Sequence, residues 1–81
     1  MTRNGKADDL FWRKGVAPGG QVVVSYADRM GVVWRAYELT RPGLGPALVF
    51  ESTNAIRVVR DYPADWHTLP RAALEALSWC V

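Results

Sequence analysis

Residues 48–66 constrain the fold of this chain more than any other stretch, because an apolar segment, a segment with helical spacing and a proline follow one another there. The aromatic and β-branched composition of residues 48–50 is typical of a strand. Ser52 and Thr53 have side-chain oxygens of the kind that cap the first turn of a helix. Apolar residues then recur at i, i+3, i+4 and i+7, namely Ala55, Val58, Val59 and Tyr62. Pro63 disfavours the helical conformation at the residue before it, so we expect a strand followed by a short helix that ends there.

Three strands are expected before that helix, over residues 21–27, 32–40 and 47–51. The first two are joined by Asp28-Arg29-Met30-Gly31, which suits a type I turn whose last residue adopts the left-handed conformation. This turn predicts a register in which Tyr26 lies opposite Trp34, Val24 opposite Ala36 and Val22 opposite Glu38. The alternative register, shifted by one residue, is ranked second because it would bury a guanidinium on the core face.

The predicted register divides the side chains of the first two strands between two faces. The expected core face carries Val22, Val24, Tyr26, Val32, Trp34 and Ala36. The second face carries Val23, Ser25, Val33, Arg35, Tyr37 and Leu39. This second face is less polar than a fully solvated sheet face, so either residues 10–12 or a partner molecule is expected to cover it.

A last helix is expected from about residue 69 to the end, with Pro70 tolerated in its first turn. Its apolar stripe consists of Ala73, Leu74, Leu77, Cys80 and Val81, and Trp79 lies off that stripe. The predicted fold is therefore α+β, a three-stranded antiparallel β-meander followed by two α-helices packed on one face. Residues 1–9 are interpreted as a flexible N-terminal tail and residues 10–81 as a single small α+β domain.

Composition excludes several classes of protein. With 49% hydrophobic residues and four tryptophans among 81 residues, the chain is too apolar to be disordered. No apolar run approaches the roughly 20 residues that cross a membrane, so no membrane association is expected. Cys80 is the only cysteine, which suits a reducing compartment, and we expect a cytoplasmic protein.

The residues that could support catalysis are few. His67 and Cys80 are the only histidine and cysteine, and no third group is marked to orient the histidine as a base. A structural zinc site needs four nitrogen or sulfur ligands, which this pair does not supply. The glycine-rich loops lack the Gly-Lys-Ser/Thr of a phosphate loop. We therefore expect no enzyme activity, no catalytic residue, no cofactor and no bound metal.

The favoured hypothesis is a small, non-catalytic, bacterial-type protein-interaction module that forms a homo-oligomer. A small domain gains apolar burial by pairing with a copy of itself, and tryptophan, tyrosine and arginine are enriched at interface hot spots. The candidate partner-binding residues are Val23, Arg35, Tyr37, Arg57, Arg60 and Trp79. The alternative is binding of single-stranded DNA or RNA by arginines beside aromatic rings, although a net charge of +2 is a small electrostatic footprint.

Overall fold

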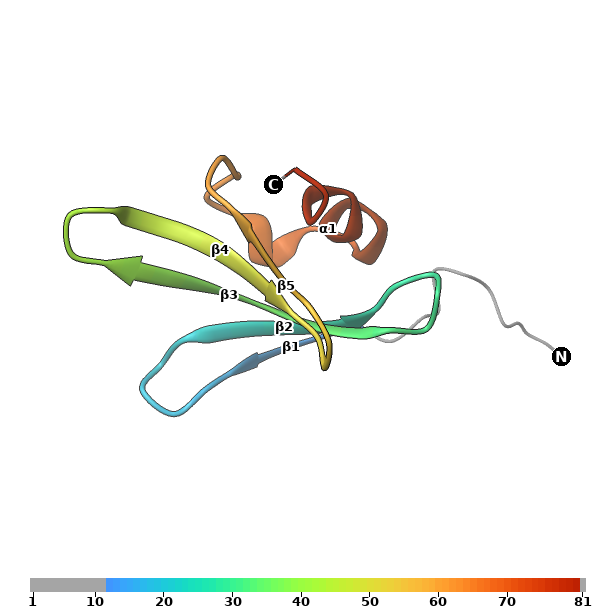
Figure 1. The fold of residues 1–81 in the computed structure, drawn as a ribbon. Helices are drawn as coiled ribbons and strands as arrows, with labels where there is room; N and C mark the ends of the chain where they lie inside the picture. Colours follow the sequence, from blue (N-terminus) through green and yellow to red (C-terminus); the bar gives the residue numbers. More distant parts are fainter. Residues whose placement is uncertain (1–11, 81) are drawn as a thin grey trace, which may run out of the picture.

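The structure, a computed structural model, describes residues 12–80, which form a five-stranded antiparallel sheet in the order β1-β2-β3-β4-β5. The strands are β1 (Trp12–Val16), β2 (Val22–Ala27), β3 (Val33–Arg41), β4 (Gly45–Glu51) and β5 (Ile56–Val59). A 3-10 turn, η2 (Trp66–Thr68), and one short helix, α1 (Arg71–Leu77), follow them. Both helical segments lie over the same face of the sheet (Figure 1).

The predicted fold class is wrong. In place of a three-stranded meander and two helices, the described residues form five strands, one short helix and a 3-10 turn. Two segments account for the difference. The expected helix after residue 52 is a turn followed by β5, and the segment beginning at Trp12 is the edge strand β1.

Strand β5 forms because pairing with β4 overrides the helical spacing of residues 55–62. Its residues alternate, with the Arg57 and Val59 side chains on the face covered by α1 and those of Ile56 and Val58 on the opposite face. Both helical and strand periodicity therefore fit the same apolar residues, and their β-branched side chains favour the strand. A helix of about ten residues has little stability of its own in water, whereas a fifth strand satisfies the backbone groups along the edge of β4.

Ser52 begins a turn and does not cap a helix. Its amide donates to the carbonyl of Ala55 at 2.8 Å, and its hydroxyl accepts a hydrogen bond from the amide of Asn54 at 3.4 Å. Ser and Asn side chains that bond to nearby backbone favour turns for the same reason that they favour helix caps. This shared preference explains why the sequence pattern is ambiguous.

Strand β1 lacks the apolar alternation that identifies a strand in sequence, because its five residues are all exposed. Trp12 pairs with Tyr26 in the register of β1 and β2, so its side chain belongs to the face covered by α1. Trp12 therefore does not cover the second face of the sheet, which is one of the two expectations for that face. The rest of residues 10–12 and the predicted tail at residues 1–9 lie outside the described residues.

The hairpin between β2 and β3 confirms the predicted register. Tyr26 lies opposite Trp34 and Val24 opposite Ala36, which excludes the slip of one residue. Gly31 has a φ of +85°, the left-handed conformation expected at the end of the turn.

The core lies between the sheet and the two helical segments. It consists of Val24, Tyr26, Trp34, Ala36, Leu48, Phe50, Val59, Trp66 and Leu74. Val22 packs against this cluster while partly buried, but the expected burial of Val32 is wrong, because 42% of its surface is exposed. Val32 precedes β3 in the hairpin loop and is not part of the sheet.

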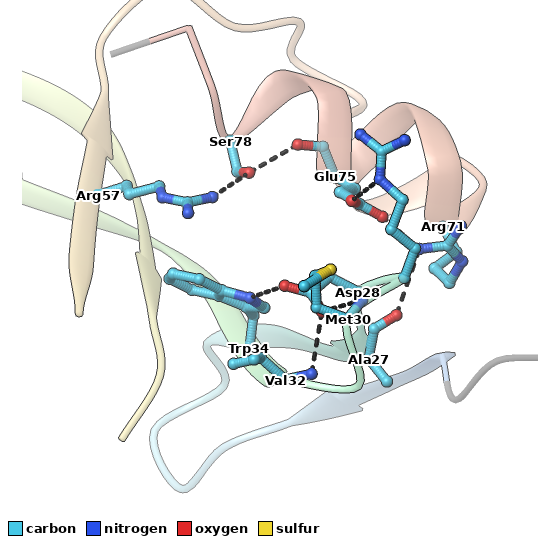
Figure 2. A network of polar contacts seen from close by, with 10 residues as sticks. Ala27, Asp28, Met30, Val32, Trp34, Arg57, Arg71, Glu75 and Ser78 are labelled. Carbon is cyan, nitrogen blue, oxygen red and sulfur yellow. Dashed lines mark hydrogen bonds and ion pairs between the residues drawn. The ribbon is translucent and has the colours of Figure 1, made fainter. Parts of the chain in front are cut away.

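Helix α1 is shorter than predicted, since it ends at Leu77. Leu74 is buried as expected, but Cys80 is exposed because the helical stripe does not continue to its position. Polar contacts hold the helix to the sheet (Figure 2). Arg71 donates to the carbonyl of Ala27 at 3.3 Å and pairs with Glu75, which also forms an ion pair with Arg29 at 3.3 Å.

The hairpin turn yields a stability prediction. Replacing Gly31 with alanine should lower the free energy of unfolding by about 1 kcal/mol, because an L-residue is strained at positive φ while no atom would contact the added Cβ. Gly15→Ala on β1 is the matched control, since its Cβ also meets open space and it has no positive φ. Urea unfolding measures both variants, and equal losses would show that the backbone conformation of Gly31 is not the cause.

Candidate interaction surface

The face of the sheet opposite α1, called the open face below, bears two neighbouring rows of side chains. The strand registers define the first row as Arg13, Ser25, Arg35, Glu51 and Ile56. The second row consists of Gly15, Val23, Tyr37, Val49 and Val58. A largely polar row therefore runs beside a largely apolar row across all five strands.

Several aliphatic side chains of the open face are exposed. The exposed fraction is 67% for Ile56, 53% for Val33, 41% for Val58 and 39% for Leu39. Single exposed aliphatic residues are ordinary on protein surfaces, but neighbouring ones that form a patch mark interaction sites. These four lie on one sheet face, Val33 and Leu39 on β3 and Ile56 and Val58 on β5, with β4 between the two strands. Leu39 and Val58 also line one hollow of this face.

A hydrogen-bonded charge pair lies in the polar row. Arg35 contacts one carboxylate oxygen of Glu51 at 3.1 Å, and the hydroxyl of Tyr37 donates to the other at 2.6 Å. The Tyr37 hydroxyl, followed by the Arg35 guanidinium, lowers the pKa of Glu51. The same hydrogen bond, followed by burial, raises the pKa of Tyr37. Glu51 is therefore held as a carboxylate near neutral pH.

A hollow of about 160 Å³ lies at the end of the open face where β3 and β4 turn. This apolar hollow is lined by Leu39, Arg41, Leu44, Gly45, Ala47, Val49, Val58 and Arg60. It is smaller than the roughly 300 Å³ of the smallest typical ligand pockets. Its size therefore suits one side chain of a partner better than a whole metabolite.

Two arginines border the apolar hollow. Neither Arg41 nor Arg60 forms an ion pair or a side-chain hydrogen bond with another described residue. Guanidinium groups beside an aliphatic floor favour a group that combines an apolar part with a negative charge.

The six predicted partner-binding residues are divided between the two sides of the sheet. Val23, Arg35 and Tyr37 lie on the open face, and Arg60 lines the apolar hollow. Arg57 and Trp79 lie on the side of α1. Arg57 and Arg60 therefore do not share one surface, because Arg57 contacts Ser78 on the side of α1 whereas Arg60 lines the apolar hollow.

Arg57 joins the C-terminal turn to the sheet. Its guanidinium carbon lies 4.3 Å from the centre of the Trp34 ring and 3.6 Å from that of Trp79. Its Nη1 donates to the hydroxyl of Ser78 at 3.0 Å (Figure 2). Trp79 remains 61% exposed beside this contact.

Sequence reasoning missed Ile56, Val58, Arg41 and Glu51 as members of this surface. The β-branched composition of residues 56–59 was the available signal for a strand that would carry Ile56 and Val58. No sequence signal placed Arg41 and Arg60 around one hollow, because Arg41 belongs to β3 and Arg60 follows β5, and β4 lies between these segments.

A second, polar cleft lies on the helical side of the sheet. It is lined by Gly20, Gln21, Val22, Glu38, Ala64, Trp66 and His67. The hydroxyl of Tyr62 donates to Glu38, and burial together with this bond raises the pKa of Tyr62 to about 12. Nδ1 of His67 is buried without a hydrogen-bond partner. No three His, Cys, Asp or Glu side chains within residues 12–80 are grouped to hold a metal ion.

No protein-family model, curated protein or solved structure matches this chain. Within the described part of the chain, no helix is long and apolar enough to cross a membrane.

Proposed function

We propose that this chain is a small, non-catalytic protein-interaction module that works in the cytoplasm and binds through its open face. Its partner is a second copy of the same chain. The observation that carries the proposal is the exposure of Ile56, Val33, Val58 and Leu39 together on one sheet face. Covering these side chains removes apolar surface from water, which is the main favourable contribution to association.

The extent of the open face supports a reversible dimer. Five strands spaced about 4.8 Å apart span about 24 Å, and the nine residues of β3 extend about 30 Å. Because the outer strands are shorter, the footprint is roughly 500 Å², below the ~800 Å² per partner of a standard interface. A dimer that dissociates on dilution fits this area.

The arrangement of charge supports pairing of like faces. Arg35 and Glu51 neutralise one another near the middle of the open face, so two copies can stack without opposing net charge there. Sheets pack face to face at a separation of about 10 Å with strand directions within about 30°. A two-fold axis between the copies makes both contribute the same surface and closes the assembly at two.

Sedimentation velocity over a range of protein concentrations tests this proposal. We expect a dimer fraction that rises with concentration, and we expect Val58→Asp to shift the equilibrium to monomer by placing a carboxylate in the apolar row. Val16→Asp is the matched control, because Val16 is 71% exposed but is paired with Val22 on the other face. A constant monomer mass at all concentrations, or equal effects of both variants, would contradict the proposal.

Binding of single-stranded nucleic acid is the second candidate function. Four arginines, Arg13, Arg35, Arg41 and Arg60, share the open face with Tyr37. Cations beside an aromatic ring are the elements that single-strand binders combine. Fluorescence anisotropy with a labelled oligonucleotide would then show binding that weakens steeply with salt and is lost in Arg35→Ala/Arg60→Ala. A flat titration at low salt excludes this function.

A further inference from the structure

We infer that Glu51 and Ile56 of one copy insert together at the apolar hollow of the other, with Glu51 over Ala47 and paired with Arg41 and Arg60, and Ile56 at the edge of the hollow. This inference rests on the proposed self-association and specifies which parts of the open face meet.

Strands β4 and β5 present the inserted group. Ile56 lies directly opposite Glu51 in their register, so an aliphatic side chain and a carboxylate stand side by side on the open face. Ile56 is 67% exposed, and the pKa of Glu51 is lowered. Together they form the combination of an apolar group and a negative charge that the apolar hollow and its two arginines favour.

The apolar hollow offers the complementary surface. Its floor is aliphatic, its volume of about 160 Å³ suits one side chain, and Arg41 and Arg60 border it. A carboxylate placed between two guanidinium groups is attracted by both. Glu51 uses one oxygen for Tyr37 and the other for Arg35, but a carboxylate has about four acceptor positions. It is therefore able to accept further donors.

The order of the rows brings these two parts together. The row of Ile56 and Glu51 lies on one side of the apolar row of Tyr37, Val49 and Val58. Leu39 and Ala47, which line the apolar hollow, lie on its other side. Each row is two residues from the next, or about 7 Å along the strands. A two-fold axis that runs along the apolar row, between the two copies, places the row of Ile56 and Glu51 of each copy over the row of Leu39 and Ala47 of the other.

This axis places each strand over the same strand of the other copy with its direction reversed. Glu51 then faces Ala47 of the second copy, between β3, which carries Arg41, and the segment after β5, which carries Arg60. Ile56 faces Arg60 at the edge of the apolar hollow. The same contact forms twice, because each copy has one inserted group and one hollow.

A pair of complementary charge reversals tests the inference. Arg60→Glu places two carboxylates together at each contact, and Glu51→Lys places two cations together. We expect each variant alone to dimerise at least about 10-fold more weakly than the unmodified chain. In a mixture of the two variants, one contact joins the two substituted positions, an ammonium against a carboxylate, and the other retains the original Glu51 and Arg60. The mixed dimer should therefore form with an affinity within about 3-fold of the original.

Sedimentation velocity with one variant carrying a fluorophore measures the mixed dimer, and thermal unfolding of each variant confirms that both are folded. Ile56→Asp, an exposed substitution, provides a second measurement and should weaken dimerisation, whereas Val16→Asp should not. If the unmodified chain dimerises but the mixture shows no recovery and Ile56→Asp has no effect, the inference is overturned while the proposed self-association stands. If the unmodified chain stays monomeric, both are overturned.

Discussion

Replacing Arg57 with alanine is expected to lower the free energy of unfolding by about 2–4 kcal/mol, although the residue lies on a short edge strand. The loss has two sources. The guanidinium stacks on Trp34 and Trp79, and cation–π contacts are worth about 0.5–2 kcal/mol each. It also donates to the hydroxyl of Ser78, and a hydrogen bond from a charged group contributes about 1.5–3 kcal/mol. Because these contributions share one side chain, they do not simply add.

Chemical denaturation followed by tryptophan fluorescence measures this effect. Arg60→Ala is the matched control, because Arg60 is exposed and forms no ion pair with another described residue, and it should change stability by less than about 0.5 kcal/mol. Arg57→Lys should fall between the two, since an ammonium keeps the charge but loses the planar stacking. Similar small effects for Arg57→Ala and Arg60→Ala would show that the stacked arginine contributes little.

Replacing Asp28 with alanine should cost about 2–4 kcal/mol, because one side chain accepts three hydrogen bonds. One of its oxygens accepts the amides of Met30 and Val32, each at 2.9 Å, and the other accepts Nε1 of Trp34 at 2.9 Å (Figure 2). The variant therefore loosens the hairpin and leaves the indole N–H of a buried tryptophan without its partner. Asp61→Ala, at an exposed aspartate, is the control and should have little effect.

The same residue predicts a dependence of stability on pH. Partial burial alone would raise the pKa of Asp28, but the hydrogen bonds from Trp34, Val32 and Met30 outweigh it and lower the pKa below the ordinary 3.8. A carboxyl group whose pKa is lower in the folded chain stabilises the fold fully at pH values above its pKa in the unfolded chain. This stabilisation is lost as the pH falls through its pKa in the folded chain.

Urea unfolding at a series of pH values checks this sign. The difference in unfolding free energy between the unmodified chain and Asp28→Asn should be constant at neutral pH and shrink below pH 3.8. A difference that stays constant into that acidic range would show that Asp28 titrates alike in the folded and unfolded chain.

Arg57 and Trp79 illustrate how a surface prediction changes when the fold changes. The sequence groups both residues with the candidate partner-binding residues because arginine and tryptophan are common at interfaces. In the structure, they contact one another and attach the C-terminal turn to the sheet. The open face instead gains Ile56, Val58 and the apolar hollow, which a helix at residues 53–62 would not have formed.

Local chemistry was sufficient to predict the hairpin between β2 and β3. An aspartate that accepts nearby amides and a glycine that tolerates positive φ act within four residues of one another. The alternation of residues 22–27 then placed Val24 and Tyr26 in the core without further information.

Only the tertiary structure decided between helix and strand for residues 56–59 and revealed β1. The spacing of the apolar residues around Val58 and Val59 fits both periods, and the unpaired edge of β4 selected the strand. Strand β1 is held by backbone pairing to β2 and exposes all its side chains, so its residues show no strand pattern in the sequence. The apolar hollow, with Arg41 and Arg60 at its border, likewise exists only because three strands lie side by side. Turn chemistry is local and depends on consecutive residues, whereas the pairing of strand edges depends on segments that the fold alone brings together.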